Sequence, residues 1–552
     1  MKPAVNLRPL WWFATALALV WVATLGWRPL FNPDEGRYAD IPLEMLQTHD
    51  FIVPHLNGVV YLEKPPLQYW ITALGYRLFP INEWSARMVL ALGFLGIQWL
   101  VFRLARTLSG ERAATVAVFM SASGLLMQLM ATLLTLDLSL TFWFTLACVS
   151  LCEAQLKRDT DAKRTALWMM VCYAAMAMAT LTKGLIGLAL PGLSLLVYSA
   201  LTRDGALWRH LHLVKGLVLY AAIVAPWFGL VEQHHPGALQ FLIIHEHFQR
   251  YLTTVHERYH PAWYFLALLL PSLLPFSLSG GRALWRRQLL TKTTRFDSER
   301  LLWSLAVVTL VFFSLSDSKL PPYILPMMPL LAVLASRHTE AQWRLDLKLN
   351  SAVVAVLGAL MVIASLQGVN LEPNASLAAL DHAKMASTLQ PWLGGFGLWL
   401  VAIGLVTFRL STPRPLIAAT TLASGFLITG IGLFHGVASD LSYRYSAKPL
   451  LATQHAIPAS EPIYTVHTFD WTLPFYLRHS AIPVGWRGEL DYGLNFEPQK
   501  GRERLSEFTE EWKNLDQGYA LLPRDVHNQL QQSGLPMTVQ AYDFDNVWVS
   551  RR

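Results

Sequence analysis

The stretch "WWFATALALVWVATLGWRPLFNPDEGRYADIP", residues 11–42, joins a long apolar run to a segment in which charged side chains crowd together between Asp34 and Asp40. The apolar run at residues 11–30 has the length of about 20 residues that a helix needs to cross a bilayer. It lacks the small-residue cleavage site of a signal peptide and leads directly into the charged segment. We therefore expect a retained membrane helix.

The rest of the chain repeats this alternation of apolar runs and charged breaks. Of its 552 residues, 53% are hydrophobic and only 15% are charged, whereas a soluble protein usually carries about a quarter charged residues. The pattern predicts a polytopic α-helical membrane protein and argues against a large soluble helical protein. We expect about 13 transmembrane helices, near residues 11–30, 86–102, 113–131, 138–155, 166–181, 185–201, 213–231, 263–279, 301–315, 322–336, 350–367, 391–408 and 415–437.

Lysine and arginine determine the expected orientation of these helices. They concentrate in alternate breaks, for example at residues 103–112, 157–164 and 282–300. Because cytoplasmic loops carry the excess of basic residues, these breaks and the N-terminus are expected on the cytoplasmic side, and an odd number of spans puts the C-terminus outside. The net charge of +7 is then explained by helix orientation and by contact with anionic membrane lipid, so no nucleic-acid partner is predicted.

Residues 440–552 differ in character from the preceding chain. Short alternating apolar runs such as "PIYTVHTF" (462–469) flank charged helical stretches such as "GRERLSEFTEEWKNL" (501–515). Strands interleaved with helices predict a small α/β domain, which the topology puts on the extracytoplasmic face. We therefore expect a transmembrane domain over residues 1–439, including an extracytoplasmic loop at 31–85, followed by a soluble α/β domain.

The breaks assigned to the extracytoplasmic side collect the residues that suit chemistry. They contain "NPDEGRY" (32–38), "YLEKPPLQYW" (61–70), "LTLDLS" (134–139), "LTKGL" (181–185), "HEHFQRYL" (245–252) and "SDSKLPPY" (316–323). Their carboxylates and cations are Asp34, Glu35, Arg37, Glu63, Lys64, Asp137, Lys183, Arg250 and Lys319. Such a mixture could bind an anionic headgroup at the bilayer surface, because cations neutralise a phosphate leaving group. The expected substrate is a lipid phosphate that carries a polar group.

Each motif also has a plain structural interpretation. Asp34 and Glu35 suit the solvated start of a loop, and the prolines after Lys64 suit a stiff turn. Asp137 is the strongest single candidate for function, because a lone carboxylate within an apolar stretch is costly and is a functional hypothesis by default.

The remaining candidates are weaker when each is taken alone. Lys183 could be a loop lysine that separates two helices. His245 and His247 suit the polar face of an interfacial helix better than a metal site. They count as candidates because they lie on the same predicted membrane face as the acids.

Taken together, the motifs resemble the lipid-linked-sugar glycosyltransferases of the GT-C architecture, the superfamily that includes protein O-mannosyltransferases. Within it, the sequence is similar to the bacterial 4-amino-4-deoxy-L-arabinose transferases that modify lipid A. The resemblance rests on "PDEGRYADI", "YLEKP", "TKG", "EHFQR", "KLPPYIL" and, near the C-terminus, "ELDYGLNF" followed by "KGR". The acidic pair Asp34–Glu35 matches the superfamily's hallmark, whereas "YGLNF" is not part of the general superfamily signature. Gly36 departs from the family, which usually has Thr or a similar residue there.

The resemblance implies transfer of the aminoarabinose from undecaprenyl phosphate to a lipid A phosphate. It also implies a periplasmic active site in the inner membrane of a Gram-negative cell, and resistance to polymyxin and other cationic antimicrobial peptides. A related GT-C transferase that uses another polyprenyl-phosphate-linked sugar or a hydroxyl acceptor stays open as an alternative. A lipid or sugar transporter fits less well, because its ionisable residues would lie near the bilayer midplane rather than at one face.

The same resemblance gives roles to individual residues. The implied catalytic or sugar-binding acids are Asp34, Asp137 and Glu35. The implied substrate-binding residues are Arg37, Tyr38, Tyr61, Lys64, Lys183, Arg250, Lys319 and Tyr323. Of these, Lys64, Lys183 and Arg250 would hold the polyprenyl phosphate.

Cofactors are also implied by resemblance. Members of the family can hold a divalent metal such as zinc near the Glu of "LEKP", which is Glu63, together with a histidine of "HEHFQR". The sequence leaves open whether that histidine is His245 or His247. No P-loop and no Gly-rich dinucleotide fingerprint occurs, so no nucleotide is expected.

The ionisation of the implied phosphate acceptor determines whether the acids have to act as a general base. A hydroxyl acceptor usually needs a carboxylate base, whereas a phosphate monoester has a second pKa of about 6 and is largely ionised at neutral pH. Asp34 would then orient the acceptor and stabilise positive charge that develops on the sugar. Asp137 suits the binding of the sugar's ammonium group.

Overall fold

The structure, a computed structural model, describes residues 7–202, 204–249, 259–285, 295–367, 377–452, 454–458 and 460–551, without the side chains of residues 247–249 and 377–380. Two compact units make up the chain. The helical unit comprises Met1–Thr24, Val89–Gln367 and Gln390–Phe434, and the mixed unit comprises Leu25–Met88, Gly368–Leu389 and His435–Arg552. The division of the chain at residue 440 into two domains stays a prediction.

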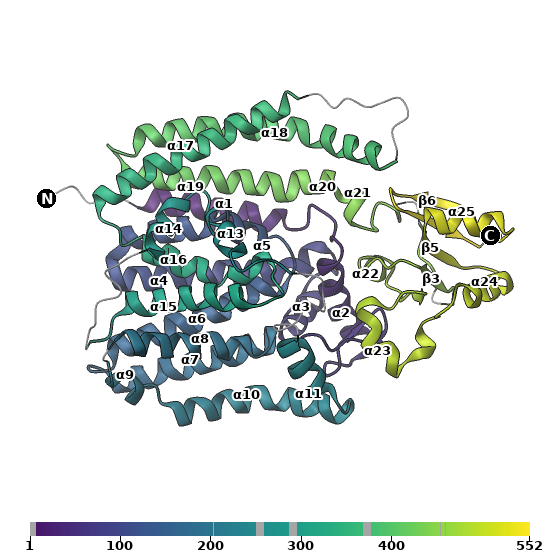
Figure 1. Ribbon diagram of the computed structural model, residues 1–552, viewed down its shortest axis with the longest axis horizontal. Coiled ribbons are helices and arrows are strands. Elements are labelled where there is room, and N and C mark those ends of the chain that lie inside the picture. Colours follow the sequence, from purple (N-terminus) through teal and green to yellow (C-terminus); the bar gives the residue numbers. More distant parts are fainter. Residues whose placement is uncertain are drawn as a thin grey trace. The chain divides into compact units, whose positions relative to one another are not determined.

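The first half of the helical unit consists of long apolar helices joined by short breaks. They are α1 (Arg8–Thr24), α4 (Glu83–Ser123, interrupted at Gly110), α5 (Leu125–Met130), α6 (Leu136–Lys157), α7 (Ala162–Lys183), α8 (Ile186–Leu201), α9 (Ala206–Arg209) and α10 (Leu213–His234). Figure 1 shows α6, α7, α8 and α10 side by side. Helix α7 packs directly against each of the other three.

The second half continues with shorter and more interrupted elements. They are α11 (Ala238–Gln240), the π-helix η1 (Phe241–Gln249), α13 (Tyr264–Ser272), α14 (Ser277–Leu284), α15 (Ser298–Leu315), η3 (Pro321–Ile324), α16 (Met327–Ala335), α17 (Glu340–Ser365), α18 (Leu377–Leu410), α19 (Pro415–Ile431) and the π-helix η4 (Gly432–Val437). The predicted span 322–336 is thus divided between η3 and α16. Proline causes this, because a ring inside the helix removes a backbone donor and clashes with the preceding turn.

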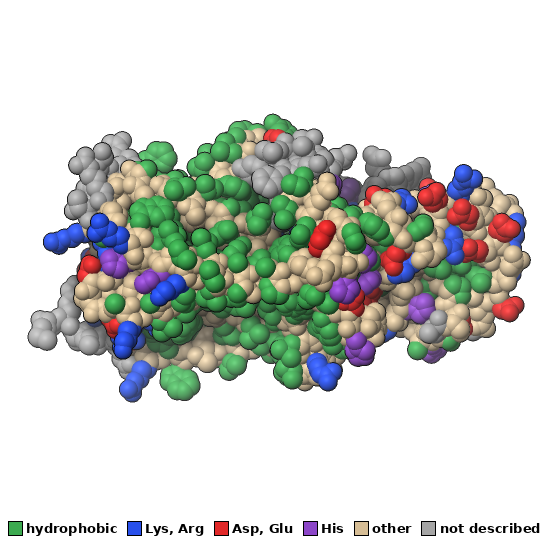
Figure 2. Space-filling view, turned by 90° about the horizontal axis from the view of Figure 1, so that it is seen from below, with side chains coloured by type: hydrophobic (Ala, Val, Ile, Leu, Met, Phe, Trp, Pro, Cys, Tyr) green, Lys and Arg blue, Asp and Glu red, His purple; other side chains and the backbone are tan. Residues whose placement is uncertain are grey.

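The helical unit has the surface of a membrane protein. Among the residues that the structure describes, eight helices are long and apolar enough to cross a bilayer. On the face that Figure 2 shows, hydrophobic side chains form a broad band, and Lys and Arg side chains gather at one end of that band. A multi-pass α-helical membrane protein is therefore confirmed, whereas the expected count of thirteen spans is not.

The mixed unit contains short helices and all of the strands that the structure describes. Its elements are α2 (Asp34–Thr48), β1 (His55–Leu56), β2 (Val59–Val60), α3 (Leu67–Leu78), α20 (Ala438–Asp440), α21 (Ser442–Tyr445), β3 (Ile463–Val466), α22 (Leu473–Leu477), β4 (Ile482–Val484), η5 (Gly488–Leu490), α23 (Asp491–Phe496), η6 (Pro498–Lys500), α24 (Leu505–Asn514), β5 (Tyr519–Pro523), α25 (Arg524–Gln532), β6 (Thr538–Tyr542) and β7 (Asn546–Ser550).

Five of the strands form one sheet, in the order β4-β3-β5-β7-β6. The strand β3 pairs in parallel with β4 and β5, and β7 pairs antiparallel with β5 and β6. Parallel neighbours need a crossover connection, which short helices supply here. The predicted C-terminal α/β domain is confirmed.

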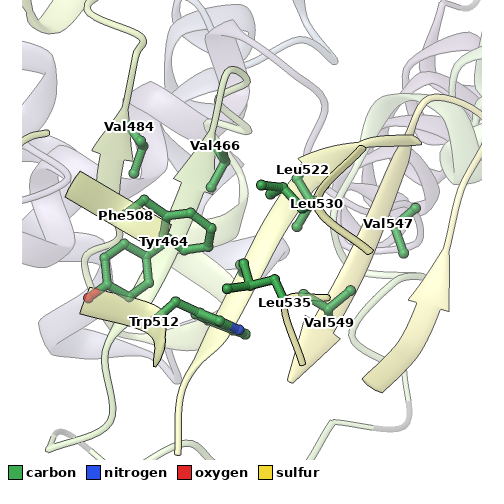
Figure 3. Close-up of a cluster of buried hydrophobic side chains, with 11 residues drawn as sticks. Tyr464, Val466, Val484, Phe508, Trp512, Leu522, Leu530, Leu535, Val547 and Val549 are labelled. Carbon is green, nitrogen blue, oxygen red and sulfur yellow. The ribbon is translucent and has the colours of Figure 1, made fainter. Parts of the chain in front are cut away.

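Alternate residues of the central strands point to opposite faces of this sheet. On one face, Tyr464 and Val466 pack against Phe508 and Trp512, which lie four residues apart on α24 (Figure 3). On the other face, Ile463 joins a second buried cluster. The period of two along β3 and the spacing of four along α24 are the periodicities expected of a strand and a helix.

Candidate active site

The acidic pair of the first loop opens helix α2, and its two members have different surroundings. Glu35 is buried, with only 2% of its side chain exposed. Arg28 donates to its two oxygens at 2.5 and 3.0 Å, and Arg87 donates at 2.9 Å to each. Burial would raise the pKa of Glu35, but the two guanidinium groups outweigh it and hold that pKa well below its ordinary value. Glu35 therefore keeps its negative charge to a lower pH than an ordinary glutamate does.

Asp34 is the open member of the pair. Its side chain is 51% exposed, and its nearest ion-pair partner is Arg37, at 3.7 Å. Both acids lie in the first turn of α2, where the helix dipole favours negative charge. The structure thus leaves one carboxylate available beside one that is fully engaged.

Arg37 links the first loop to the C-terminal motif "ELDYGLNF". Its guanidinium donates to Glu489 at 2.7 Å, and Trp471 donates from its indole nitrogen to the other oxygen of Glu489 at 3.1 Å. The charge of Arg37 also lies 5.6 Å from the ring centre of Tyr38 and 5.9 Å from that of Tyr61. A buried cation is therefore fixed on the same turn as Asp34.

Tyr61 lies beside this cation, and Lys64 follows Tyr61 three residues further along the chain. The Tyr61 hydroxyl is buried and has no hydrogen-bond partner among the described residues. Burial raises the pKa of Tyr61 well above its ordinary value, so its phenol stays a neutral donor. Lys64 is half-buried and donates to the Glu63 carbonyl at 2.8 Å. The unsatisfied hydroxyl suits a polar ligand atom.

The departure from the family at Gly36 has a physical reason in this structure. A Cβ atom at Gly36 would collide with the carbonyl group of Trp471. The helix α2 therefore approaches the backbone before α22 closely, and a further link joins Asn32 to Asp470 at 2.6 Å.

A tight hairpin fixes the other end of the loop. Asn57 and Gly58 have the positive φ angles of 55° and 74° that a two-residue hairpin turn requires. The Asn57 side chain exchanges two hydrogen bonds of 2.7 Å with the backbone of Ala481. Two buried acids bind the turn, since Asp40 accepts from the Asn57 amide at 3.1 Å and Glu44 from the Gly58 amide at 2.6 Å.

In the folded chain these two acids keep their protons to a higher pH than ordinary carboxyl groups do. Burial raises the pKa of Asp40 to about 6 and that of Glu44 well above its ordinary value. The proximity of one carboxyl to the other adds to the effect on Glu44, because like charges disfavour a second ionisation. The hairpin is thus held by a carboxyl pair whose charge depends on pH.

In the helical unit, Asp137 and Lys183 face one another. Helices α6 and α7 run antiparallel, so the first turn of α6 lies beside the last turn of α7. The Lys183 ammonium contacts an Asp137 oxygen at 2.5 Å and lies 5.1 Å from the ring centre of Tyr323. An anion at a helix N-terminus and a cation at a C-terminus both match the helix dipoles. The structure brings these three predicted residues together.

Lys319 binds backbone carbonyl groups instead of a carboxylate. It is buried and donates to the His260 carbonyl at 2.7 Å and to the Ser316 carbonyl. Tyr259 and Ser318 form an isolated bridge between the same two segments. These contacts make Lys319 a link between two loops.

Of the three predicted metal ligands, the structure describes the side chains of Glu63 and His245. His245 lies on η1, stacks on Phe241 at 4.9 Å and has Glu246 at 3.6 Å. The side chain of His247 and all of Arg250 lie outside the described residues. Within the described part of the chain, no three His, Cys, Asp or Glu side chains come together to hold a metal ion.

Sequence reasoning missed the residues that hold the loop in place. Arg28 and Arg87 bind Glu35, and Glu489 binds Arg37. A signal was present for all three, because the two arginines stand at the predicted extracytoplasmic ends of spans and Glu489 opens a family motif.

Comparisons with known proteins agree along the chain. A family described as "Aminoarabinose transferase C-terminal domain" matches residues 450–551, and one described as "Dolichyl-phosphate-mannose-protein mannosyltransferase" matches residues 63–229. An "undecaprenyl phosphate-alpha-4-amino-4-deoxy-L-arabinose arabinosyl transferase" from Edwardsiella ictaluri is 30% identical over 93% of this chain and 94% of its own. The protein of that name from Pseudomonas aeruginosa is 30% identical, with coverage of 87% and 86%.

A solved structure extends the likeness to the whole fold. The crystal structure of ArnT from Cupriavidus metallidurans bound to undecaprenyl phosphate matches with a TM-score of 0.88 and 32% identity, covering 99% of both chains. Fold and site together therefore define a multi-pass membrane glycosyltransferase of the GT-C type. Within that class, the chain belongs to the undecaprenyl phosphate-4-amino-4-deoxy-L-arabinose arabinosyl transferase family.

Proposed function

We propose that this chain transfers 4-amino-4-deoxy-L-arabinose from undecaprenyl phosphate to a phosphate of lipid A. The names of its relatives and the undecaprenyl phosphate bound to the Cupriavidus protein support this donor. The observation that carries the proposal is the ion pair of Arg37 and Glu489, in which the C-terminal motif engages the loop that presents Asp34.

The transfer exchanges one phosphate for another at the anomeric carbon. An oxygen of the lipid A phosphate attacks that carbon, and the bond from the carbon to the undecaprenyl phosphate oxygen breaks. The electron pair leaves with undecaprenyl phosphate. Because the acceptor phosphate is largely ionised at neutral pH, no proton has to be removed from it.

Asp34 would act on the sugar. Its exposed carboxylate can approach the positive charge that develops at the anomeric carbon, and charge stabilisation of this kind is a large contribution to catalysis. Glu35 would not take part in the chemistry, because Arg28 and Arg87 already engage both of its oxygens. We assign Glu35 to holding the first turn of α2.

The donor phosphate would be held by cations. Lys64, Lys183 and Arg250 are the candidates, and Tyr61 and Tyr323 would line the phosphate site. The 2.5 Å ion pair favours a positioning role for Asp137, since it holds the Lys183 ammonium in place. Arg37, Tyr38 and Lys319 would then support the binding surfaces rather than bind substrate.

The cellular consequence follows from charge. An added aminopentose brings one ammonium group to a phosphate of the outer envelope, and this weakens its attraction for cationic peptides such as polymyxin. We place the enzyme in the inner membrane of a Gram-negative cell with its site on the periplasmic side, as the distribution of Lys and Arg indicates.

Mass spectrometry of lipid A tests the proposal. Cells that lack their own aminoarabinose transferase are given this chain, and their lipid A is expected to gain one aminopentose on a phosphate, with higher survival in polymyxin. A gain of another sugar, or of a sugar on a hydroxyl, would replace the proposal with a sister transferase. No gain from a folded, membrane-inserted chain would contradict it.

A further inference from the structure

A hollow of about 430 Å³ lies at the end of the helical unit away from the Asp137–Lys183 pair. Its wall is made by Trp99, Phe102, Arg103, Arg106, Thr107, Glu153 and Lys157. Glu153 stands 16 residues after Asp137 on α6, which places it about 24 Å along the helix at 1.5 Å per residue. The hollow therefore lies near the opposite membrane face.

The hollow carries more positive than negative charge. Its one carboxylate, Glu153, has only 2% of its side chain exposed and lies 3.3 Å from Arg103 and 3.2 Å from Lys157. Thr107 donates to Glu153 at 3.3 Å. Arg106 forms no ion pair with any residue that the structure describes, so one carboxylate stands against three cations.

Aromatic rings surround these cations. The Arg103 guanidinium lies 4.7 Å from the ring centre of Trp168 and 5.9 Å from that of Trp99. Trp99 is 57% exposed on the outside of the unit. Tryptophan at this depth is typical of the interface between membrane and water.

An apolar stripe leads from the hollow toward the middle of the membrane. Leu92, Leu95 and Trp99 are all largely exposed on α4 and follow the spacing of one helix face. Arg103 and Arg106 continue the same face by steps of four and three residues. One face of α4 thus offers an apolar path for an acyl chain that ends in a basic hollow for a headgroup.

We propose that this hollow binds the phosphate headgroup of an anionic phospholipid, such as phosphatidylglycerol, from the leaflet opposite the active site. Guanidinium and ammonium groups bind phosphate through charge-assisted hydrogen bonds, and basic pockets between transmembrane helices are suited to such headgroups. Glu153 leaves two of the three positive charges in the hollow unbalanced, and these can neutralise a phosphate group. The exposed leucines of α4 can contact the acyl chain of the same lipid. The bound lipid would fasten α4 to α6 through Arg106 and Lys157.

Native mass spectrometry of the purified full-length chain in detergent tests this site. The variant Arg106→Gln/Lys157→Gln is compared with Arg112→Gln/Lys163→Gln, which removes the same charge from exposed positions at the same end of the unit. Binding of phosphatidylglycerol is expected to weaken at least tenfold in the first variant and to stay unchanged in the second. The single variant Arg106→Gln, which breaks no ion pair, serves if the double variant does not fold.

Competing ligands distinguish the possible sources of phosphate. Neither phosphatidylcholine nor inorganic phosphate is expected to displace phosphatidylglycerol from the native chain. Displacement by inorganic phosphate alone would identify a site for a free anion and overturn the proposal. The proposal would also be overturned if Arg106→Gln/Lys157→Gln lost binding of undecaprenyl phosphate and kept binding of phosphatidylglycerol. Equal losses of phosphatidylglycerol binding in the two double variants would overturn it as well.

Discussion

Arg37 donates a hydrogen bond of 2.7 Å to Glu489, a residue 452 positions further along the chain. The pair joins the acidic loop motif to the C-terminal motif "ELDYGLNF", and Trp471 holds the second oxygen of Glu489. The C-terminal domain is therefore part of the framework that orients the first turn of α2. The two motifs are in direct contact although they are far apart in the sequence.

The substitution Glu489→Gln tests the importance of this contact. Arg37 has only 7% of its side chain exposed and would lose its charged partner. A hydrogen bond to a charged group is worth about 1.5–3 kcal/mol, so transfer is expected to slow by about 10- to 100-fold. The rate is measured with purified enzyme and donor, and the exposed Glu510→Gln serves as control. Equal rates in the two variants would show that the C-terminal motif has no part in activity.

Glu35→Gln is expected to damage folding. Arg28 and Arg87 are almost fully buried and would share an uncharged partner, and breaking a buried ion pair costs about 3–5 kcal/mol. Thermal melting of the detergent-solubilised chain should show a midpoint several degrees lower, whereas Asp34→Asn should melt close to the native chain. A Glu35→Gln chain that melts normally but transfers no sugar would instead give Glu35 a chemical role.

The carboxyl pair at the hairpin predicts a dependence of stability on pH. The folded chain keeps a proton on Asp40 up to a pKa of about 6, whereas the unfolded chain releases it near the ordinary value of 3.8. The folded state thus binds more protons in this window, and its free energy of unfolding falls as pH rises from about 4 to about 6. Asp40→Asn removes the contribution of Asp40 to this slope and leaves that of Glu44, whose pKa is also raised.

Melting midpoints of both chains between pH 4 and pH 7 measure the effect. The midpoint of the native chain should fall relative to that of Asp40→Asn across the window, and the difference should level off near pH 7, about one pH unit above the pKa of Asp40 in the folded chain. The comparison is necessary because Glu35, whose pKa is lowered, changes stability in the opposite sense at the acidic end. Parallel curves for the two chains would argue against the raised pKa of Asp40.

Lys183 and Lys319 are expected to differ although both carry the charge of a lysine at the same predicted membrane face. Lys183 is held by Asp137, and under the proposed function its ammonium binds the donor phosphate, so Lys183→Gln should raise the KM for the donor by about tenfold, which corresponds to about 1.4 kcal/mol. Lys319 bonds two carbonyl groups, so Lys319→Gln should lower the melting midpoint and leave KM nearly unchanged. If Lys319→Gln raised KM for the donor and Lys183→Gln lowered only the melting midpoint, the two lysines would have each other's roles.

Local patterns predicted much of this fold. The alternation around Tyr464 and the spacing of Phe508 and Trp512 indicated strands and a helix because neighbours in sequence share their faces. The proximity of Asp137 and Lys183 was also within reach, since two adjacent antiparallel helices bring the start of one to the end of the next. Such contacts follow from chain geometry over short distances.

Other features depend on contacts that no local pattern records. The opposite environments of Asp34 and Glu35 arise from Arg28 and Arg87, which reach one of the two acids only after folding. The split of the predicted span 322–336 depends on how proline interrupts a helix, which hydrophobicity alone does not show. The carboxyl pair of Asp40 and Glu44 likewise forms around a hairpin turn that only the folded loop brings to it.

The most direct test of the central claim compares Asp34→Asn with Asp516→Asn in cells that lack their own aminoarabinose transferase. Both variants remove one exposed carboxylate from the mixed unit, and only Asp34 stands beside Arg37. Mass spectrometry of lipid A should show the aminopentose with the native chain and with Asp516→Asn, and none with Asp34→Asn at equal amounts of folded protein. An equal gain of aminopentose with Asp34→Asn would contradict the assignment of Asp34 to the chemistry of transfer.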